Sequence, residues 1–281
     1  MKKILILTDF SDPAWNALFT ALKLHEGREC QFYILHTYEP SFAGVLGNTA
    51  KKRVGVLYDS LEAHTESELD RIEEYLGMHQ HEPRHHFKTL SLAEDLVDGI
   101  QKTVREKEID LIVMGTKGAT GAREVFMGSN TVRVIKKVRN CPILLVPATS
   151  DFKMLHAVIF PTDFTQYYDP YELSPLLDLV NAWSAKIIVF QVAQEFRLSP
   201  EQDANRKLLE KRLKGAHIEW KRGSLKSTVE AAIMEFIETC DADLIALIHY
   251  HHTFMERLTR EPVIKKIGFH TPVPMLVLPD L

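Results

Sequence analysis

The 281-residue chain has the length of about two domains, with 45% hydrophobic and 26% charged residues. Its formal net charge of −4 at pH 7 argues against a general nucleic-acid binder, because such proteins carry a strong basic excess. The cysteines form no Cys-x-x-Cys motif and no apolar run has the length of a signal peptide or a membrane span, which predicts a cytoplasmic protein outside the membrane.

Short apolar runs alternate with amphipathic stretches along the first half of the chain. Continuous β-branched runs predict buried parallel strands, and the patterns between them predict helices that cover both faces of the sheet. The expected strands are Lys3–Thr8, Cys30–Thr37, His85–Leu90, Ile109–Gly115 and Pro142–Pro147. The expected helices are 11–26, 60–79, 92–108 and 129–140. In the first helix, Ser11 or Asp12 is the expected N-cap and Pro13 the first helical residue.

The second half of the chain repeats the first. "ILILTDFSD" at 4–12 returns as "VIFPTDFTQ" at 158–166, and "CPILLVP" at 141–147 returns as "VPMLVLP" at 273–279. Two further runs, "FYILHTYE" and "IDLIVMG", return between them in the same order as "IIVFQVAQ" and "ADLIALI". This order predicts a tandem duplication with a short polar linker at 148–153. The expected fold is α/β, with two doubly wound, Rossmann-like domains at 1–148 and 153–281.

The two halves differ in two places. The first half carries the extra stretch 38–56, which contains Gly and Pro and little helical periodicity, and we interpret it as a long loop near the strand ends. The first half also has "MGTKGATGAREVFMGSN" after its fourth strand, where the second half has "LIHYHHTFMERLTREPV". The copies have therefore diverged where a ligand of a doubly wound sheet would bind.

The glycine segment has the composition of an anion site. Ligands of open α/β sheets bind beyond the carboxyl ends of the strands, where glycine lets backbone amides approach a phosphate. Gly115 and Gly118 would lie on one side of a polyphosphate, and Gly128 and Ser129 on the other, at the start of a helix beginning at Ser129 or Asn130. The alternative is a plain turn with Ser129 as an N-cap.

The spacing G-x-x-G, nine residues, then G-S resembles the ATP-binding signature of universal stress proteins. The opening "LILTDFSD" also resembles that family's first strand and acidic turn. The resemblance covers essentially the whole chain, as two universal stress domains in tandem. It implies five parallel strands in the order 3-2-1-4-5 in each domain, and a bound ATP or related adenine nucleotide. Because polyphosphates normally arrive with Mg²⁺, a divalent ion could accompany the nucleotide.

The resemblance also implies roles for individual residues. Asp9, with Thr8 beside it, would contact the ribose, the main chain at Thr37 would meet the adenine, and Met114 would line the pocket. The phosphates would be held by Gly115, Gly118, Gly128, Ser129 and Asn130. Lys117 and Arg123 could reach phosphate oxygens, but we expect both to be solvated surface residues.

The second half departs from this signature. Asp163 matches the acidic turn, but the glycines are absent, so we expect a pseudo-copy that pairs with the first half or regulates it. His249, His251 and His252 raise the possibility of a metal site, yet zinc needs three or four ligands and no further ligand has a recognisable spacing. We therefore expect these histidines to be exposed loop residues.

Three functions remain open from the residues. The first is a nucleotide-binding stress or signalling module, the second a slow ATPase or nucleotidyl transferase, and the third a scaffold that works through protein contacts without a nucleotide. The last strands, "PILLVP" and "PMLVLP", are suited to edge pairing, so the two halves of one chain could pair with each other. A homodimer and an unknown protein partner are also open.

Overall fold

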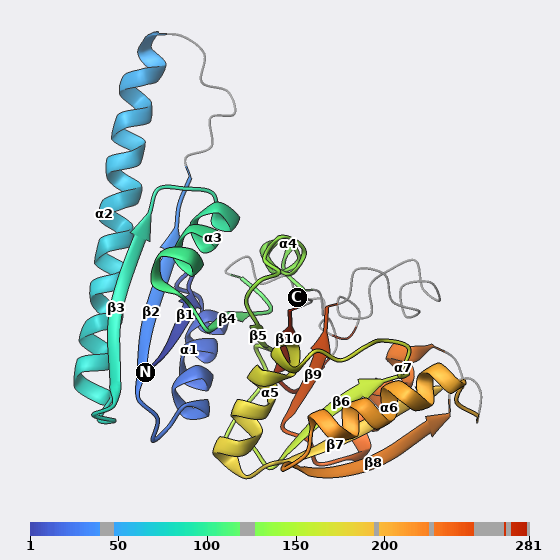
Figure 1. The fold of residues 1–281 in the computed structure, drawn as a ribbon. Helices are drawn as coiled ribbons and strands as arrows, with labels where there is room; N and C mark the ends of the chain where they lie inside the picture. Colours follow the sequence, from blue (N-terminus) through green and yellow to red (C-terminus); the bar gives the residue numbers. More distant parts are fainter. Residues whose placement is uncertain are drawn as a thin grey trace.

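A computed structural model provides the structure of the chain (Figure 1), and it describes residues 1–39, 48–118, 127–193, 197–224, 228–249, 267 and 271–279. The strands of the first half are β1 Lys2–Leu7, β2 Cys30–Thr37, β3 His85–Leu92, β4 Leu111–Gly115 and β5 Ile143–Val146. Those of the second half are β6 Ala157–Thr162, β7 Lys186–Ala193, β8 His217–Ser224, β9 Leu244–Ile248 and β10 Met275–Leu278. The helices are α1 Asp12–Leu24, α2 Asn48–His79, α3 Leu96–Lys107, α4 Ser129–Lys137, α5 Pro170–Trp183, α6 Pro200–Arg212 and α7 Val229–Thr239.

All these strands belong to one sheet. Its order is β3-β2-β1-β4-β5-β10-β9-β6-β7-β8. The first half therefore has the expected order 3-2-1-4-5 of parallel strands. The second half has the same order when it is read from the opposite edge of the sheet, as β8-β7-β6-β9-β10. The halves meet where β5 and β10 pair antiparallel, with Leu144 opposite Leu276. The expected pairing of the last strands within one chain is thus observed.

Helices cover both faces of the sheet, because each face carries its own apolar core. One core joins the inner sides of α1, α2, α5 and α6 to residues such as Ile4, Phe32 and Phe160. The other joins α3, α4 and α7 to residues such as Leu5 and Ile245. Alternate strand residues point to opposite faces, so nearly continuous apolar strands serve both cores.

Polar contacts also join the two halves. The indole Nε1 of Trp183 donates to the carbonyl of Leu24 at 2.9 Å, and Lys23 Nζ donates to the carbonyl of Phe152 at 3.2 Å. These bonds run between α1 and α5 or the linker before β6, on the same face of the sheet. They hold the two halves in a fixed orientation in addition to the strand pair.

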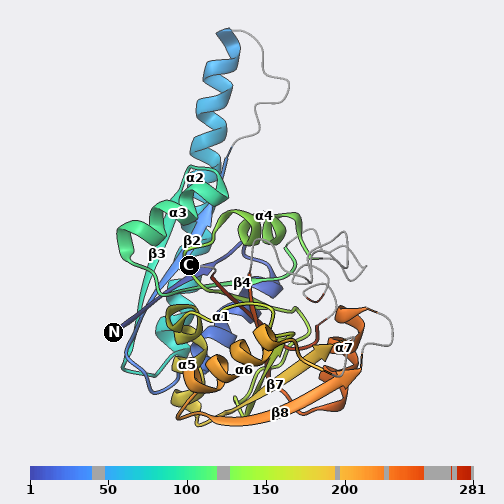
Figure 2. The ribbon, with the colours of Figure 1, turned by 45° about the vertical axis from the view of Figure 1, so that its right-hand side comes forward.

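The prediction of a long loop at 38–56 is wrong for residues 48–56, because α2 already begins at Asn48. Residues 40–47 lie outside the described residues. Gly55 lies within this helix because a single glycine costs a helix only about 1 kcal/mol, and no proline follows Asn48 before the helix ends. In two views the N-terminal part of α2 extends beyond the sheet (Figure 1, Figure 2).

Two helix starts also differ from the prediction. The helix expected from residue 92 begins at Leu96, because β3 continues to Leu92 and Asp95 caps the helix by accepting from Val97 N at 2.9 Å. In α1, Ser11 is the N-cap as expected, but Asp12 precedes Pro13 inside the helix, so Pro13 is the second helical residue. No helix in the described part of the chain combines the length and apolar composition that a membrane span requires.

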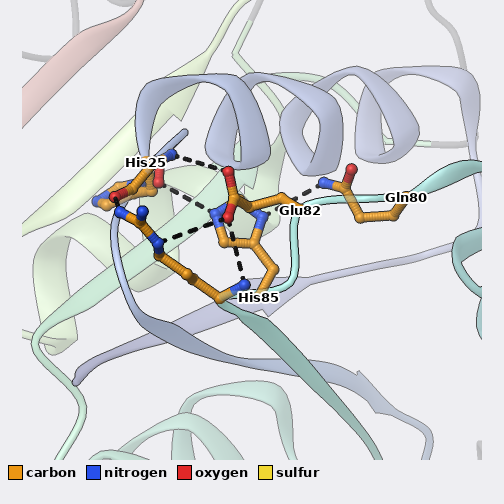
Figure 3. A network of polar contacts seen from close by, with 6 residues as sticks. His25, Gln80, Glu82 and His85 are labelled. Carbon is orange, nitrogen blue, oxygen red and sulfur yellow. Dashed lines mark hydrogen bonds and ion pairs between the residues drawn. The ribbon is translucent and has the colours of Figure 1, made fainter.

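A network of polar contacts lies at the amino ends of β2 and β3, between the turns that precede these strands (Figure 3). His85 Nε2 lies 3.0 Å from the carbonyl of His25, and Glu82 Oε2 accepts from Gly27 N at 3.2 Å. These contacts tie the turn after α1 to the turn before β3. His25 is completely buried, and its Nε2 atom has no hydrogen-bond partner among the described residues.

This burial predicts a pH-dependent stability. Loss of hydration holds the pKa of His25 at about 3, below its ordinary 6.5. Between these values the unfolded chain binds a proton that the folded chain does not, so the free energy of unfolding falls as pH falls, by about 1.4 kcal/mol per pH unit. We expect His25→Leu to remove this part of the slope.

Urea unfolding at about pH 6.5 and about pH 5 measures the effect, and over that interval the wild-type protein should lose about 2 kcal/mol more than His25→Leu. Equal losses in the two proteins would show that His25 does not exclude the proton.

Candidate functional site

The candidate site lies where the sheet order reverses, between β1 and β4. These strands are neighbours, with Ile4 opposite Leu111 and Ile6 opposite Val113. The chain leaves β1 toward α1 on one face, and leaves β4 toward α4 on the other. Diverging connections of this kind open a crevice at the carboxyl ends of the strands. A cavity of about 450 Å³ opens at this place.

The cavity brings together all the residues predicted for the site. Its lining includes Thr8, Asp9, Thr37, Met114, Gly115, Gly118, Gly128, Ser129 and Asn130. Nine further lining residues were not predicted from the sequence, and they are Leu7, Ala14, His36, Glu39, Glu94, Asp95, Leu96, Thr131 and Arg133. Lys117 also lines the cavity, whereas Arg123 lies outside the described residues.

One end of the cavity is formed by the start of α4. Gly128 is the N-cap and has no side chain that could accept from the first-turn amides, and the first helical bond runs from Val132 N to Gly128 O at 3.1 Å. The amide of Gly128 itself donates to the carbonyl of Thr116 at 2.8 Å. The amides that this helix offers to an anion therefore begin at Ser129, and Gly128 contributes an open approach rather than a donor.

Two glycines of the segment lie where a Cβ would come within 3.0 Å of another group. A Cβ on Gly118 would lie 2.8 Å from Asp9 Oδ2, and a Cβ on Gly115 would lie 2.9 Å from the carbonyl oxygen of Pro13. The loop after β4 is thus pressed against the turn after β1. Gly115 would have a packing role at the start of α1 even without a ligand, whereas Gly118 sets the distance between the loop and a carboxylate.

The turn after β1 holds Asp9 at the rim. Phe10 adopts a left-handed conformation with φ of 64°, and its amide donates to Thr8 Oγ1 at 3.0 Å. Asp9 Oδ1 accepts from Ser11 N at 3.2 Å, which fixes the carboxylate beside the start of α1. A bulky residue at positive φ is uncommon and costs of order 1–3 kcal/mol, so the bonds around it must hold the turn.

The second half contains the same turn. Phe164 has φ of 61°, its amide donates to Thr162 Oγ1 at 3.0 Å, and Asp163 Oδ1 accepts from Thr165 N at 3.0 Å. The turn persists where the glycine signature is lost. Its geometry is therefore a property of the duplicated fold, and an acidic turn alone does not identify a ligand site.

Charged side chains surround the mouth of the cavity. Arg133 Nη2 lies 2.6 Å from Asp95 Oδ2, and this guanidinium lowers the pKa of the Asp95 carboxyl. The pair connects the N-cap of α3 to the second turn of α4. Glu94 is paired with Lys102 at 2.6 Å. These residues were hidden in the sequence because they come together only when α3 and α4 pack side by side.

His36 lies at the end of β2, inside the cavity lining. Its Nδ1 is 2.8 Å from the carbonyl oxygen of Thr8, and its ring centroid is 4.5 Å from that of Phe10. Burial lowers the pKa of His36, although the Thr8 carbonyl and Asp9 act in the opposite direction. The imidazole is therefore neutral at pH 7. Its position next to Thr37 was the available signal in the sequence.

The histidine run of the second half stays untested as a metal site. His249 follows β9 and donates its amide to the carbonyl of Leu278 at 3.0 Å, whereas His251 and His252 lie outside the described residues. Across the described ranges, no group of three or more His, Cys, Asp and Glu side chains is arranged to hold a metal ion.

Comparisons with known proteins agree with the repeated fold. Universal stress protein MJ0531 of Methanocaldococcus jannaschii is 29% identical over 146 residues, which are 52% of this chain and 81% of that protein. Universal stress protein YxiE of Bacillus subtilis is 25% identical over 150 residues, 51% of this chain and 97% of that protein. The crystal structure of a universal stress protein from Archaeoglobus fulgidus has a TM-score of 0.70 at 15% identity, covering 99% of this chain and 96% of that one, so the fold extends over both halves.

The family model described as the universal stress protein family matches residues 1–147. This match includes β1 through β5, the glycine segment and the cavity, and it spans more than half of the chain. The chain belongs to the universal stress protein family.

Proposed function

We propose that the chain binds ATP or a related adenine nucleotide in the cavity between β1 and β4, and acts as a stress-response or signalling module. One observation carries the proposal: every residue selected from the sequence signature lines the same cavity of about 450 Å³. That volume lies in the range of small-molecule and cofactor sites, about 300–1,000 Å³.

The phosphates would lie at the start of α4. The first-turn amides from Ser129 onward and the positive end of the helix dipole favour an anion there, and Gly118 leaves room for close approach. Lys117 and Arg133 add positive charge to the lining. Asp9 would repel a phosphate but accepts well from hydroxyl groups, so the ribose would lie beside Asp9 and the adenine farther along, near the main chain of Thr37.

Mg²⁺ would enter the site with the phosphates. The described residues offer no cluster that would hold a metal by itself. Phosphate oxygens and water are the ligands that Mg²⁺ prefers, and an ion held by them would neutralise charge that meets Asp9 and Glu39 in the lining. Binding of ATP is therefore expected to be tighter with Mg²⁺ than without it.

The second half would act as a pairing or regulatory copy. It keeps the acidic turn at Asp163 but lacks glycines at the positions of Gly115, Gly118 and Gly128. Its β10 completes the sheet against β5, which is a structural role independent of nucleotide. We also propose a cytoplasmic location, because Cys30, Cys141 and Cys240 are free thiols, as in reducing compartments.

Isothermal titration calorimetry with ATP, with and without Mg²⁺, tests the proposed site when the wild-type protein is compared with Gly118→Ala. Gly118→Ala would push the Asp9 carboxylate away without straining backbone, whereas Gly115→Ala would clash with a main-chain oxygen and is a poorer probe. We expect about one site per chain in the wild-type protein and an affinity loss of roughly tenfold in Gly118→Ala, the value of one hydrogen bond to a charged group.

Gly77→Ala is the matched control, because a Cβ on Gly77 of α2 would meet no atom within 4 Å. It should bind ATP as the wild-type protein does. No heat of binding with any adenine nucleotide would contradict the proposal, as would equal affinities of the wild-type protein and Gly118→Ala.

The two acidic turns provide a second test. Asp9→Asn and Asp163→Asn make the same change in the same turn, and asparagine supports such turns as aspartate does. If the ribose lies at Asp9, Asp9→Asn should weaken ATP binding roughly tenfold or more, because a charge-assisted hydrogen bond is lost. Asp163→Asn should change the affinity less than about twofold. Equal effects of the two substitutions would place the nucleotide elsewhere.

A further inference from the structure

The neutral imidazole of His36 has a defined proton position. Its Nδ1 faces the carbonyl oxygen of Thr8 at 2.8 Å, and a carbonyl oxygen can only accept. Nδ1 therefore carries the proton, and Nε2 of the neutral ring is left as a hydrogen-bond acceptor. The contact thus assigns the tautomer of a side chain that lines the cavity.

The surroundings of His36 keep the ring in this state. Asp9 after β1 raises the pKa of His36, and His64 on α2 lowers it. Ser91, the register partner of His36 on β3, is uncharged. Burial outweighs the Asp9 carboxylate and lowers the pKa of His36. The Asp9 carboxylate and His36 Nε2 are therefore both hydrogen-bond acceptors of residues that line the cavity near the ends of β1 and β2.

The position of the phosphates in the cavity determines which part of a nucleotide lies beside these acceptors. Gly118 brings the loop after β4 against Asp9, where a Cβ would be only 2.8 Å from the carboxylate. In a nucleotide the sugar is joined directly to the phosphates and the base is one group farther away. A ligand with its phosphates at the start of α4 thus presents its sugar to Asp9, and His36 lines the same cavity.

We propose that Asp9 and His36 together bind the vicinal hydroxyls of a ribose, so that the site selects ribonucleotides over deoxyribonucleotides. Each of the two side chains would accept from one of the two hydroxyl donors. This inference rests on the proposed function and assigns His36 as its specificity-determining side chain.

The second half has a glutamine at the position that corresponds to His36. Gln191 of β7 is the register partner of Thr162. In the first half, Leu7 pairs with Leu35, and His36 is the next residue of β2. Gln191 therefore occupies the position in the second half that His36 occupies in the first. The side-chain oxygen of Gln191 accepts from Arg222 Nε at 3.1 Å, so an acceptor at this position is already engaged within the protein. The pair of sugar-binding acceptors is therefore a feature of the first half.

Calorimetric titration of the full chain with ATP, 2′-deoxy-ATP, 3′-deoxy-ATP and inosine triphosphate tests the proposal. Each deoxynucleotide should bind the wild-type protein roughly 5–10-fold more weakly than ATP, as expected for one lost hydrogen bond. His36→Phe should weaken ATP about as much and reduce the preference at one of the two hydroxyls to less than about twofold. His64→Phe, which changes the other ring near Phe10 outside the cavity lining, should keep both preferences.

Two additional variants separate a binding role from a structural one. His36→Leu also lacks an acceptor and should behave as His36→Phe does, and it replaces that variant if the larger ring prevents folding. His36→Gln can both donate and accept, and it should recover part of the preference. Circular dichroism and thermal unfolding establish that each variant is folded.

The outcomes distinguish this inference from the proposed function. No binding of ATP by the wild-type protein would overturn both. Binding of ATP with unchanged hydroxyl preferences in His36→Phe and His36→Leu would overturn the role of His36 alone. A loss on inosine triphosphate that disappears in His36→Phe would show that His36 binds the adenine amine instead, and would also overturn the inference.

Discussion

The adjacency of β1 and β4 is the constraint on which the candidate site depends. Because these parallel strands are hydrogen-bonded neighbours and their connections leave toward opposite faces, their carboxyl ends cannot be covered by the same helix. The turn after β1 and the loop after β4 then meet directly, with Gly118 against Asp9. Helix α4 starts at the same rim and supplies uncapped amides. One strand order therefore brings a carboxylate, a helix N-terminus and an open cavity together.

The glycines and the acidic turn serve the packing of the fold as well as a possible ligand. Gly115 is required by the main chain of Pro13, and the amide of Gly128 is bonded to Thr116, so these glycines shape the loop as well as leaving room for a ligand. The acidic turn occurs in both halves, including the one without the glycine segment. The glycine signature is therefore in part a packing signature, and the proposed nucleotide site depends mainly on the first turn of α4, on Gly118 and on Asp9.

The parts that were predictable from the sequence are those fixed locally. Continuous β-branched runs located the strands, their repetition predicted the paired halves, and the glycine spacing selected residues that line one cavity. The start of α2 at Asn48 was missed because Gly55 and a weak apolar period resemble a loop. His36, Asp95 and Arg133 were missed because their partners lie on other elements: the carbonyl of Thr8 faces His36, and Asp95 meets Arg133 across two helices.

Photo-crosslinking with 8-azido-ATP, followed by mass spectrometry of the labelled peptides, tests the central claim most directly. If the reversal between β1 and β4 forms the nucleotide site, the base lies near the ends of β2 and β3, and the label should be found on peptides that contain Thr37–Glu39 or Glu94–Leu96. Excess unlabelled ATP should suppress it. Label confined to β6 through β10, or label that unlabelled ATP does not displace, would contradict the account.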